Sequence, residues 1–128
     1  MKRQHLKLIL RIAVAIILIQ TLRFKFTAHP DSVYIFEQVG LEPYGRIGIG
    51  IVELIAGILI LIPRTVWMGA LLSMGVLSGA IFMHFTKLGI EVNNDGGLLF
   101  ITALVTFILS AVVLFIYRKD IPVIGKKL

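Results

Sequence analysis

The chain has 128 residues, of which 58% are hydrophobic and only 16% are charged. A soluble domain of this size has too little interior to hide that much apolar surface, so the composition excludes an ordinary soluble enzyme and favours a membrane protein. The formal net charge is +6, but it does not indicate nucleic-acid binding, because the basic residues stand at the ends of apolar segments. With no cysteine, this chain cannot hold a disulfide, a thiol redox centre or a thiolate metal site.

Four apolar stretches each approach the roughly 20 residues that a helix needs to cross the hydrocarbon core of a bilayer. The sequence therefore predicts an all-α fold, a polytopic membrane four-helix bundle that forms one domain over residues 1–128. The spans are expected at about residues 6–26, 46–62, 66–85 and 97–117. The basic start resembles a signal peptide, but the apolar run continues to Phe26 and no good cleavage site follows. We therefore expect an uncleaved first helix.

The long connection after the first span contains the sequence HPDSVYIFEQVG, which predicts a short helix. Pro30 suits a first helical position and Gly40 a C-terminal cap. Val33, Phe36 and Val39 recur at three-residue spacing and form an apolar stripe. Such a helix is expected to lie at the membrane interface rather than to cross the bilayer.

The distribution of basic residues predicts the topology. Cytoplasmic segments of membrane proteins carry an excess of lysine and arginine. The excess here precedes the first span, occupies the turn after the second and follows the fourth: Lys2, Arg3, Lys7, Arg11, Arg64, Arg118, Lys119, Lys126 and Lys127. Both termini are therefore expected to face the cytoplasm, with the protein in the bacterial inner membrane.

The second span is apolar from end to end except for Glu53. An ionised carboxylate in hydrocarbon is expensive, so a partner or a change of protonation is expected. Arg46, Gly50, Glu53 and Gly57 recur at steps of three and four residues and so share one face. Because small residues let helix backbones approach, this face predicts close packing against another helix, with the acid in the contact.

The third span contains Gly75 and Gly79 in a small-xxx-small pattern, which also predicts a helix contact. In the fourth span, Thr102, Thr106 and Ser110 drift slowly along one side. The simpler interpretation of these hydroxyl groups is that each bonds a preceding carbonyl of its own helix.

Four ionisable residues from different segments are expected at the outer side: Lys25, Glu53, His84 and Asp95. Glu53 follows Arg46 by seven residues and so lies about 10 Å below the outer boundary. We expect Glu53 to face the bundle interior and to meet Lys25, His84 or both. Two interpretations stay open: a buried cluster of ion pairs and hydrogen bonds that fixes helix register, or a site that binds a polar headgroup or moves protons.

No metal site is predicted. Glu53 and His84 alone would leave a metal ion under-coordinated. A haem held by two histidines is not expected either, because His5 and His29 stand in flanking segments rather than inside the bundle.

From about Arg11 to Tyr117 the chain resembles the DoxX family of small four-helix membrane proteins. The likeness rests on an ordered set of residues across correctly sized spans: Arg11, Lys25, Phe36, Gly40, Pro43, Glu53, Gly57, Arg64 and His84. Many members end the fourth helix with a glycine-rich sequence that bears an aspartate. This chain instead has VVLFIYRK followed by Asp120.

The resemblance implies a first hypothesis, a membrane subunit associated with a redox complex. Named DoxX members are linked to quinone-coupled sulfur oxidation and to membrane oxidoreductase complexes that handle oxidative stress. In this hypothesis Glu53 accepts or relays a proton, His84 bonds a quinone carbonyl or shares that proton, and Lys25 holds Glu53 ionised or stabilises a reduced anion. The electrons come from a membrane or periplasmic protein partner, so the chain alone is not a complete enzyme.

Two other hypotheses stay open. Distant animal relatives resemble assembly chaperones for receptor channels, which suggests a non-catalytic assembly or stabilising factor. Its partner would dock on Gly75 and Gly79 or on the first outer loop, and Lys25, Glu53 and His84 would be structural. A small transporter or a proton-conducting oligomer ranks last, because four short helices leave little room for a substrate path. A homo-oligomer stays open in each case.

Overall fold

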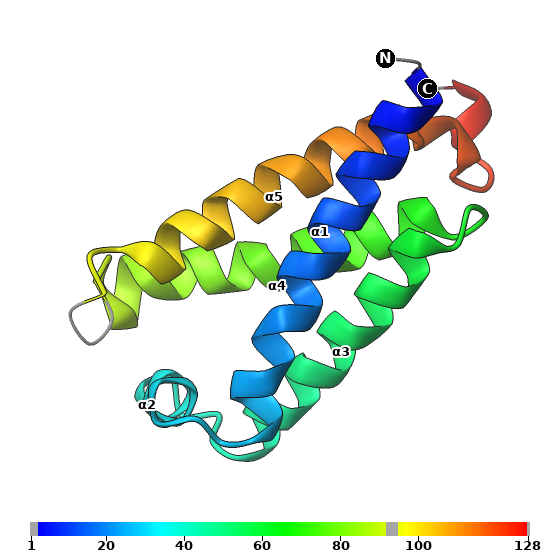
Figure 1. Ribbon diagram of the computed structural model, residues 1–128. Helices are drawn as coiled ribbons and strands as arrows, with labels where there is room; N and C mark the ends of the chain where they lie inside the picture. The colour runs from blue at the N-terminus through cyan, green and yellow to red at the C-terminus, as the bar shows by residue number, and fades with distance from the viewer. Residues whose placement is uncertain (1–2, 92–94, 128) are drawn as a thin grey trace.

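The computed structural model describes residues 3–91 and 95–127, and every regular element in these ranges is helical (Figure 1). The elements in chain order are α1 (Arg3–Phe26), α2 (Pro30–Gln38), α3 (Tyr44–Leu61), α4 (Val66–Met83), the π-helical η1 (His84–Leu88), α5 (Leu98–Ile116), and the 3₁₀ turns η2 (Arg118–Asp120) and η3 (Gly125–Lys127).

In these described ranges, four helices are long and apolar enough to cross a membrane: α1, α3, α4 continued by η1, and α5. The prediction of an all-α chain with four spans is confirmed, and the predicted ends of the spans lie within one helical turn of the observed ends. Of these four helices, α5 has the highest mean hydropathy.

The four long helices form two pairs, α1 with α3 and α4 with α5, and α3 also packs along α4. Figure 1 shows the two pairs meeting where the N- and C-termini lie together and diverging toward the opposite end. We call these the termini end, with residues 3–18, 56–70 and 113–127, and the loop end, with residues 21–53, 84–91 and 95–98. α2 lies at the loop end and contacts α1, α3 and η1.

The apolar core lies toward the termini end. It is a cluster of small and branched side chains from all four long helices: Val14, Ala15, Leu18, Ala56, Ile60, Val66, Ala70 and Val113. Because these side chains come from the middle of α1, the end of α3, the start of α4 and the end of α5, the helices are held together where the chain termini meet.

Gly69 sets the distance between α3 and α4. A Cβ atom at this position would lie 2.5 Å from the backbone nitrogen of Ile60 and 2.7 Å from the carbonyl oxygen of Ala56. Only glycine permits this approach, because backbone atoms cannot move aside as a flexible side chain can. The sequence analysis did not single out Gly69.

Arg11 is buried at the termini end, against the last turn of α3. Its Nε donates to the carbonyl of Ile60 at 2.9 Å, and its Nη2 donates to the carbonyl of Leu61 at 2.8 Å. The guanidinium also lies 5.7 Å from the ring centroid of Tyr117. The last carbonyls of a helix have no partner within that helix, and a cation there opposes the negative end of the helix dipole. Arg11 therefore joins α1 to the end of α3 instead of only flanking the first span.

The short helix predicted in the first long connection is present as α2. Pro30 stands in its first turn, and the Nδ1 atom of His29 accepts a hydrogen bond from the Asp31 amide at 3.2 Å. The prediction of its apolar stripe was partly wrong. Phe36 is buried, but the other buried residue is Ser32. These two residues are four apart, so the inward face follows the helical repeat of 3.6 residues.

Candidate functional site

The structure joins Lys25 of α1 to Glu53 of α3. The Lys25 Nζ atom lies 2.8 Å from Glu53 Oε1, and the two side chains are only 16% and 6% exposed. Thr21, one turn before Lys25, adds a hydroxyl group 3.1 Å from Glu53 Oε2 and accepts a hydrogen bond from Lys25 Nζ at 3.4 Å. Both carboxylate oxygens therefore have a partner. We call these three residues the Lys25–Glu53 cluster.

Thr21 has only one hydroxyl proton for two nearby acceptors. Its Oγ1 atom lies 2.8 Å from the carbonyl oxygen of Leu18 as well as 3.1 Å from Glu53 Oε2. Rotation of the hydroxyl group therefore decides whether Glu53 receives a hydrogen bond from Thr21. The sequence analysis missed Thr21, although its position four residues before Lys25 places both on one face of α1.

Two glycines of α3 bring the backbone of that helix close to α1 on either side of Glu53. A Cβ atom at Gly50 would lie 2.7 Å from Cε1 of Phe26, and one at Gly57 would lie 3.2 Å from Cγ1 of Ile19. Without side chains at these positions, α1 and α3 approach closely enough for a direct ion pair. The structure thus places Gly50, Glu53 and Gly57 together on the face of α3 that meets α1.

Arg46 lies next to the cluster at the start of α3. Its Nε atom is 2.9 Å from each carboxylate oxygen of Glu42, and its Nη1 donates to the backbone carbonyl of Lys25. Arg46 is buried. Its hydrogen bond to this carbonyl binds the last turn of α1 in the way that Arg11 binds the last turn of α3. The sequence analysis placed Arg46 on the correct face, but it did not predict this contact.

His84 is engaged elsewhere at the loop end. Its Nδ1 atom lies 2.9 Å from the carbonyl oxygen of Gly89, and its ring meets the Phe100 ring edge-on with the centroids 5.4 Å apart. Because a carbonyl oxygen only accepts, Nδ1 carries the proton in this contact. The contacts described for His84 are thus with Gly89, directly after η1, and with α5, and they do not include Lys25 or Glu53.

Asp95 also acts within its own segment. Its Oδ1 atom accepts from the Gly97 amide at 2.8 Å, and its Oδ2 atom accepts from the Leu99 amide at 3.1 Å. A carboxylate at this place satisfies free amides at the start of a helix and opposes the positive end of its dipole. Asp95 therefore caps α5, and these two contacts do not join it to the Lys25–Glu53 cluster.

Gly75 and Gly79 lie on an exposed face of α4. A Cβ atom at either position would meet nothing within 4 Å. Within the part of the chain that the structure describes, these two glycines therefore contact no other helix, in contrast to Gly69 on the same element. A shallow apolar groove of about 420 Å³ lies between this face and α5; Phe82, Phe85 and Phe107 are among its lining residues.

The hydroxyl groups of α5 divide into two kinds. Thr102 donates to Leu98 and Thr106 to Thr102, as expected for hydroxyls that bond their own helix. Ser110 instead lies 2.7 Å from Ser73 of α4, and both serines are fully buried. The hydroxyl groups of Ser73 and Ser110 thus join α4 to α5 near the apolar core.

Among residues 3–91 and 95–127, no group of three histidine, aspartate or glutamate side chains is arranged to hold a metal ion. The cluster can instead bind or release protons at Glu53, and Lys25 can donate hydrogen bonds to an oxygen acceptor.

An all-helical chain with four spanning helices and an ion pair buried between two of them is a multi-pass membrane protein. A sequence model of the DoxX family matches residues 6–86, and the chain belongs to this family. The match runs from α1 through α4 and ends before α5. The resemblance seen in the sequence extended as far as Tyr117, so the match covers less of the chain than that resemblance suggested. Comparison with curated proteins and with solved structures gives no match.

Proposed function

We propose that this protein is a membrane subunit of a redox system and that the Lys25–Glu53 cluster contacts a quinone headgroup. The supporting observation is the ion pair of 2.8 Å between two membrane-spanning helices. Ionisable groups inside spans are rare and expensive, and they commonly mark proton or ligand pathways. The ion pair joins the last turn of α1 to α3 at the loop end, and Figure 1 shows the two pairs of helices diverging toward that end.

The chemical groups of the cluster fit a quinone. An ammonium group has three hydrogens, and the described contacts of Lys25 use two of them, toward Glu53 and Thr21. The third can donate to a quinone carbonyl oxygen. Reduction of a quinone to a quinol takes up two electrons and two protons. Glu53 would relay these two protons one after the other from water to the quinone, and a partner protein would supply the two electrons.

We also propose that both termini face the cytoplasm of a bacterial inner membrane and that α2 lies at the opposite interface. Among the described residues, Asp120 is the only acidic side chain at the termini end. The basic side chains there are Arg3, Lys7, Arg11, Arg64, Arg118, Lys119, Lys126 and Lys127. This imbalance supports the orientation under the positive-inside rule. A fluorescent protein fused to the C-terminus should fluoresce if that end is cytoplasmic, and a periplasmic phosphatase fused there should stay inactive.

The test of the quinone proposal is extraction of the lipids that co-purify with the protein. We expect quinone, measured by absorbance and mass, in the wild-type sample and its loss in Glu53→Gln. Glu42→Gln is the matched control, because Glu42 is a carboxylate at the same end that pairs with Arg46 instead. Circular dichroism should show that both variants keep their helices.

A wild-type sample without quinone would contradict the proposal. Equal quinone in Glu53→Gln and wild type would do the same, because the carboxylate would then have no part in binding. If Glu53→Gln lowers only the melting temperature and leaves quinone bound, the cluster serves only to hold α1 and α3 together.

A second candidate is a non-catalytic assembly factor, supported by the open face around Gly75 and Gly79. Because a Cβ at either glycine meets nothing in the chain, larger side chains should not disturb the fold. Under this alternative, Gly75→Leu/Gly79→Leu keeps the wild-type melting temperature but loses a protein partner found by cross-linking in membranes. Retention of every cross-linked partner by this variant would remove the alternative.

A further inference from the structure

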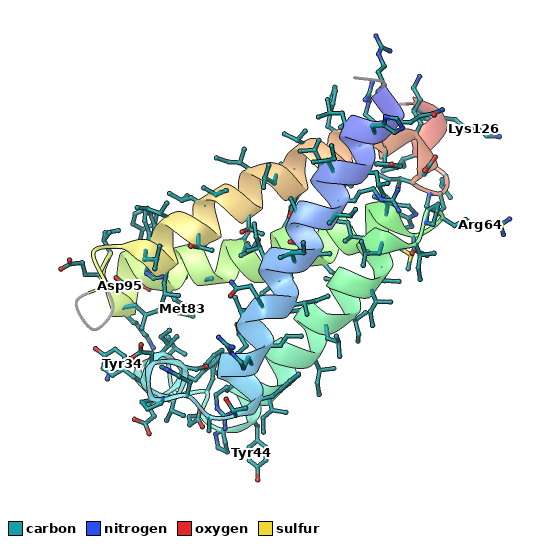
Figure 2. All side chains as sticks on the ribbon, viewed as in Figure 1. Tyr34, Tyr44, Arg64, Met83, Asp95 and Lys126 are labelled. Carbon is teal, nitrogen blue, oxygen red and sulfur yellow. The ribbon has the colours of Figure 1, made fainter. Side chains whose placement is uncertain are left out.

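The termini end gathers cations from distant parts of the chain. Arg3 and Lys7 come from the start of α1, Arg64 from the turn after α3, and further lysines from the segment after α5. Figure 1 shows the two termini side by side, and Figure 2 shows Arg64 and Lys126 pointing outward at this end. The fold therefore concentrates positive charge that is scattered in the sequence.

Most of this charge is not neutralised within the described residues. The salt bridges Lys25–Glu53 and Arg46–Glu42 are both at the loop end. Lys119, Lys126 and Lys127 are exposed and take part in neither. Unpaired cations crowded on one surface create a potential that attracts anions.

The segment after α5 is a folded hook, residues 118–127. The Gly125 amide donates to the Ile121 carbonyl at 2.8 Å, and the Lys127 amide donates to the Ile124 carbonyl at 2.9 Å. Gly125 is buried so tightly that a Cβ there would lie 2.4 Å from the carbonyl oxygen of Lys119. The hook thus has a defined shape, which its own backbone holds.

The hook presents apolar side chains between its lysines. Val123 is 90% exposed and Ile124 is 51% exposed. Val123 has φ of +70°, which β-branched residues rarely adopt. At this position the described residues leave the Val123 side chain almost fully exposed. Exposed apolar groups beside cations are the two features that bind peptides to an anionic membrane surface.

We propose that the hook is a binding site for an anionic phospholipid. Lys119, Lys126 and Lys127 contact the phosphate of the headgroup, and Val123 and Ile124 enter the adjoining acyl region. The site belongs to the leaflet at the termini end, whichever side of the membrane that is. It does not depend on the proposed redox function, because it lies at the opposite end from the Lys25–Glu53 cluster.

The first experiment measures lipid binding to the purified full-length protein by native mass spectrometry, with phosphatidylglycerol and phosphatidylcholine as the two probes. We expect preferential retention of phosphatidylglycerol. Lys126→Gln/Lys127→Gln should weaken its binding about 25-fold, since each cation near an anionic surface contributes about fivefold. Arg3→Gln/Arg64→Gln is the matched control, because it removes the same charge from the same end but outside the hook. It should change binding less than about fivefold.

Two results would overturn the proposal: equal binding of the two lipids, or equal losses in the two double variants. The second result would mean that diffuse charge, and not the hook, attracts the lipid. Unchanged circular dichroism and melting temperature in both variants would show that the losses do not arise from unfolding.

The second experiment separates a lipid from a free anion. Val123→Ser/Ile124→Ser keeps every charge, and it should weaken phosphatidylglycerol binding because the acyl contact is lost. Inorganic phosphate at millimolar concentration should not displace the lipid. Undiminished lipid binding in this variant, or displacement by phosphate, would show an anion site without lipid specificity and would overturn the proposal.

Discussion

The two ends of the helical bundle are held by different interactions. At the termini end, buried apolar side chains such as Val14, Ile60, Val66 and Val113 pack in one cluster. At the loop end, the buried side chains are mostly polar or charged, among them Glu53. The termini end is closed by apolar packing together with the hydrogen bonds of Arg11, whereas the loop end depends on a small number of specific polar contacts. Changes at the two ends should therefore differ in kind.

One interaction is repeated at both ends of the α1–α3 pair. Arg11 of α1 binds the last carbonyls of α3, and Arg46 of α3 binds the Lys25 carbonyl in the last turn of α1. Antiparallel helices place the start of each helix beside the end of the other, so one arginine can satisfy free carbonyls at each end. The two arginines differ in their surroundings, because Arg46 also pairs with Glu42 and Arg11 faces only neutral groups in its described contacts.

The largest effect is expected for Arg11→Met, which should lower the free energy of unfolding by about 3 kcal/mol. The substitution removes two hydrogen bonds from a charged donor and leaves two carbonyls at the end of α3 without a partner. Unfolding in mixed micelles measures this loss. Arg64→Met is the control, because Arg64 is an exposed arginine at the same end. Equal losses in the two variants would contradict the role of Arg11.

Gly69→Ala should be the next most harmful, with a loss of about 2 kcal/mol from overpacking. The new methyl group would meet the backbone of α3, which cannot rotate away. Gly75→Ala on the same helix meets open space, and it should be neutral or stabilising by up to about 1 kcal/mol because alanine favours helix. The difference between the two melting temperatures is the measurement. Equal melting temperatures would show that α3 and α4 are not packed as closely as Gly69 indicates.

The sequence could predict the fold because its strongest signals are local. Apolar stretches of spanning length fix the four helices, and Pro30 marks the start of α2. The face with Gly50, Glu53 and Gly57 also followed from helical periodicity alone. Periodicity did not predict which helix this face would meet. Lys25 could be named as a partner of Glu53 only by its expected depth in the membrane.

Other features could not be predicted because they depend on how the helices cross. His84 is expected from the sequence at a depth like that of Lys25, but it belongs to the other pair of helices, and the pairs diverge at the loop end (Figure 1). Gly75 had the stronger sequence signal on α4, a small-xxx-small pattern with Gly79, but only Gly69 lies where α3 approaches. Periodicity gives the face of a helix, and only tertiary structure gives the neighbour of that face.

The ion pair at the loop end should show a coupling energy of about 1.5 kcal/mol between Lys25→Met and Glu53→Gln. The coupling is moderate because the Lys25 side chain is 16% exposed and also contacts Thr21. A double-mutant cycle of unfolding free energies measures it. The control cycle pairs Lys25→Met with Glu42→Gln, whose carboxylate binds Arg46, and should give less than about 0.5 kcal/mol. Equal coupling energies in the two cycles would mean that Glu53 and Glu42 act on Lys25 only through long-range electrostatic interaction.

The smallest effect is expected for Ser73→Ala, which should lower the free energy of unfolding by about 0.6 kcal/mol, the mean for a hydrogen bond between membrane helices. The loss is small because the freed Ser110 hydroxyl can turn to a carbonyl of its own helix, as Thr102 and Thr106 do. Ser78→Ala is the control, since Ser78 is exposed and bonds only Met74 in the described contacts. If both serine variants are equally neutral, the hydroxyl pair adds nothing to the α4–α5 contact. In that case apolar packing alone holds this pair of helices.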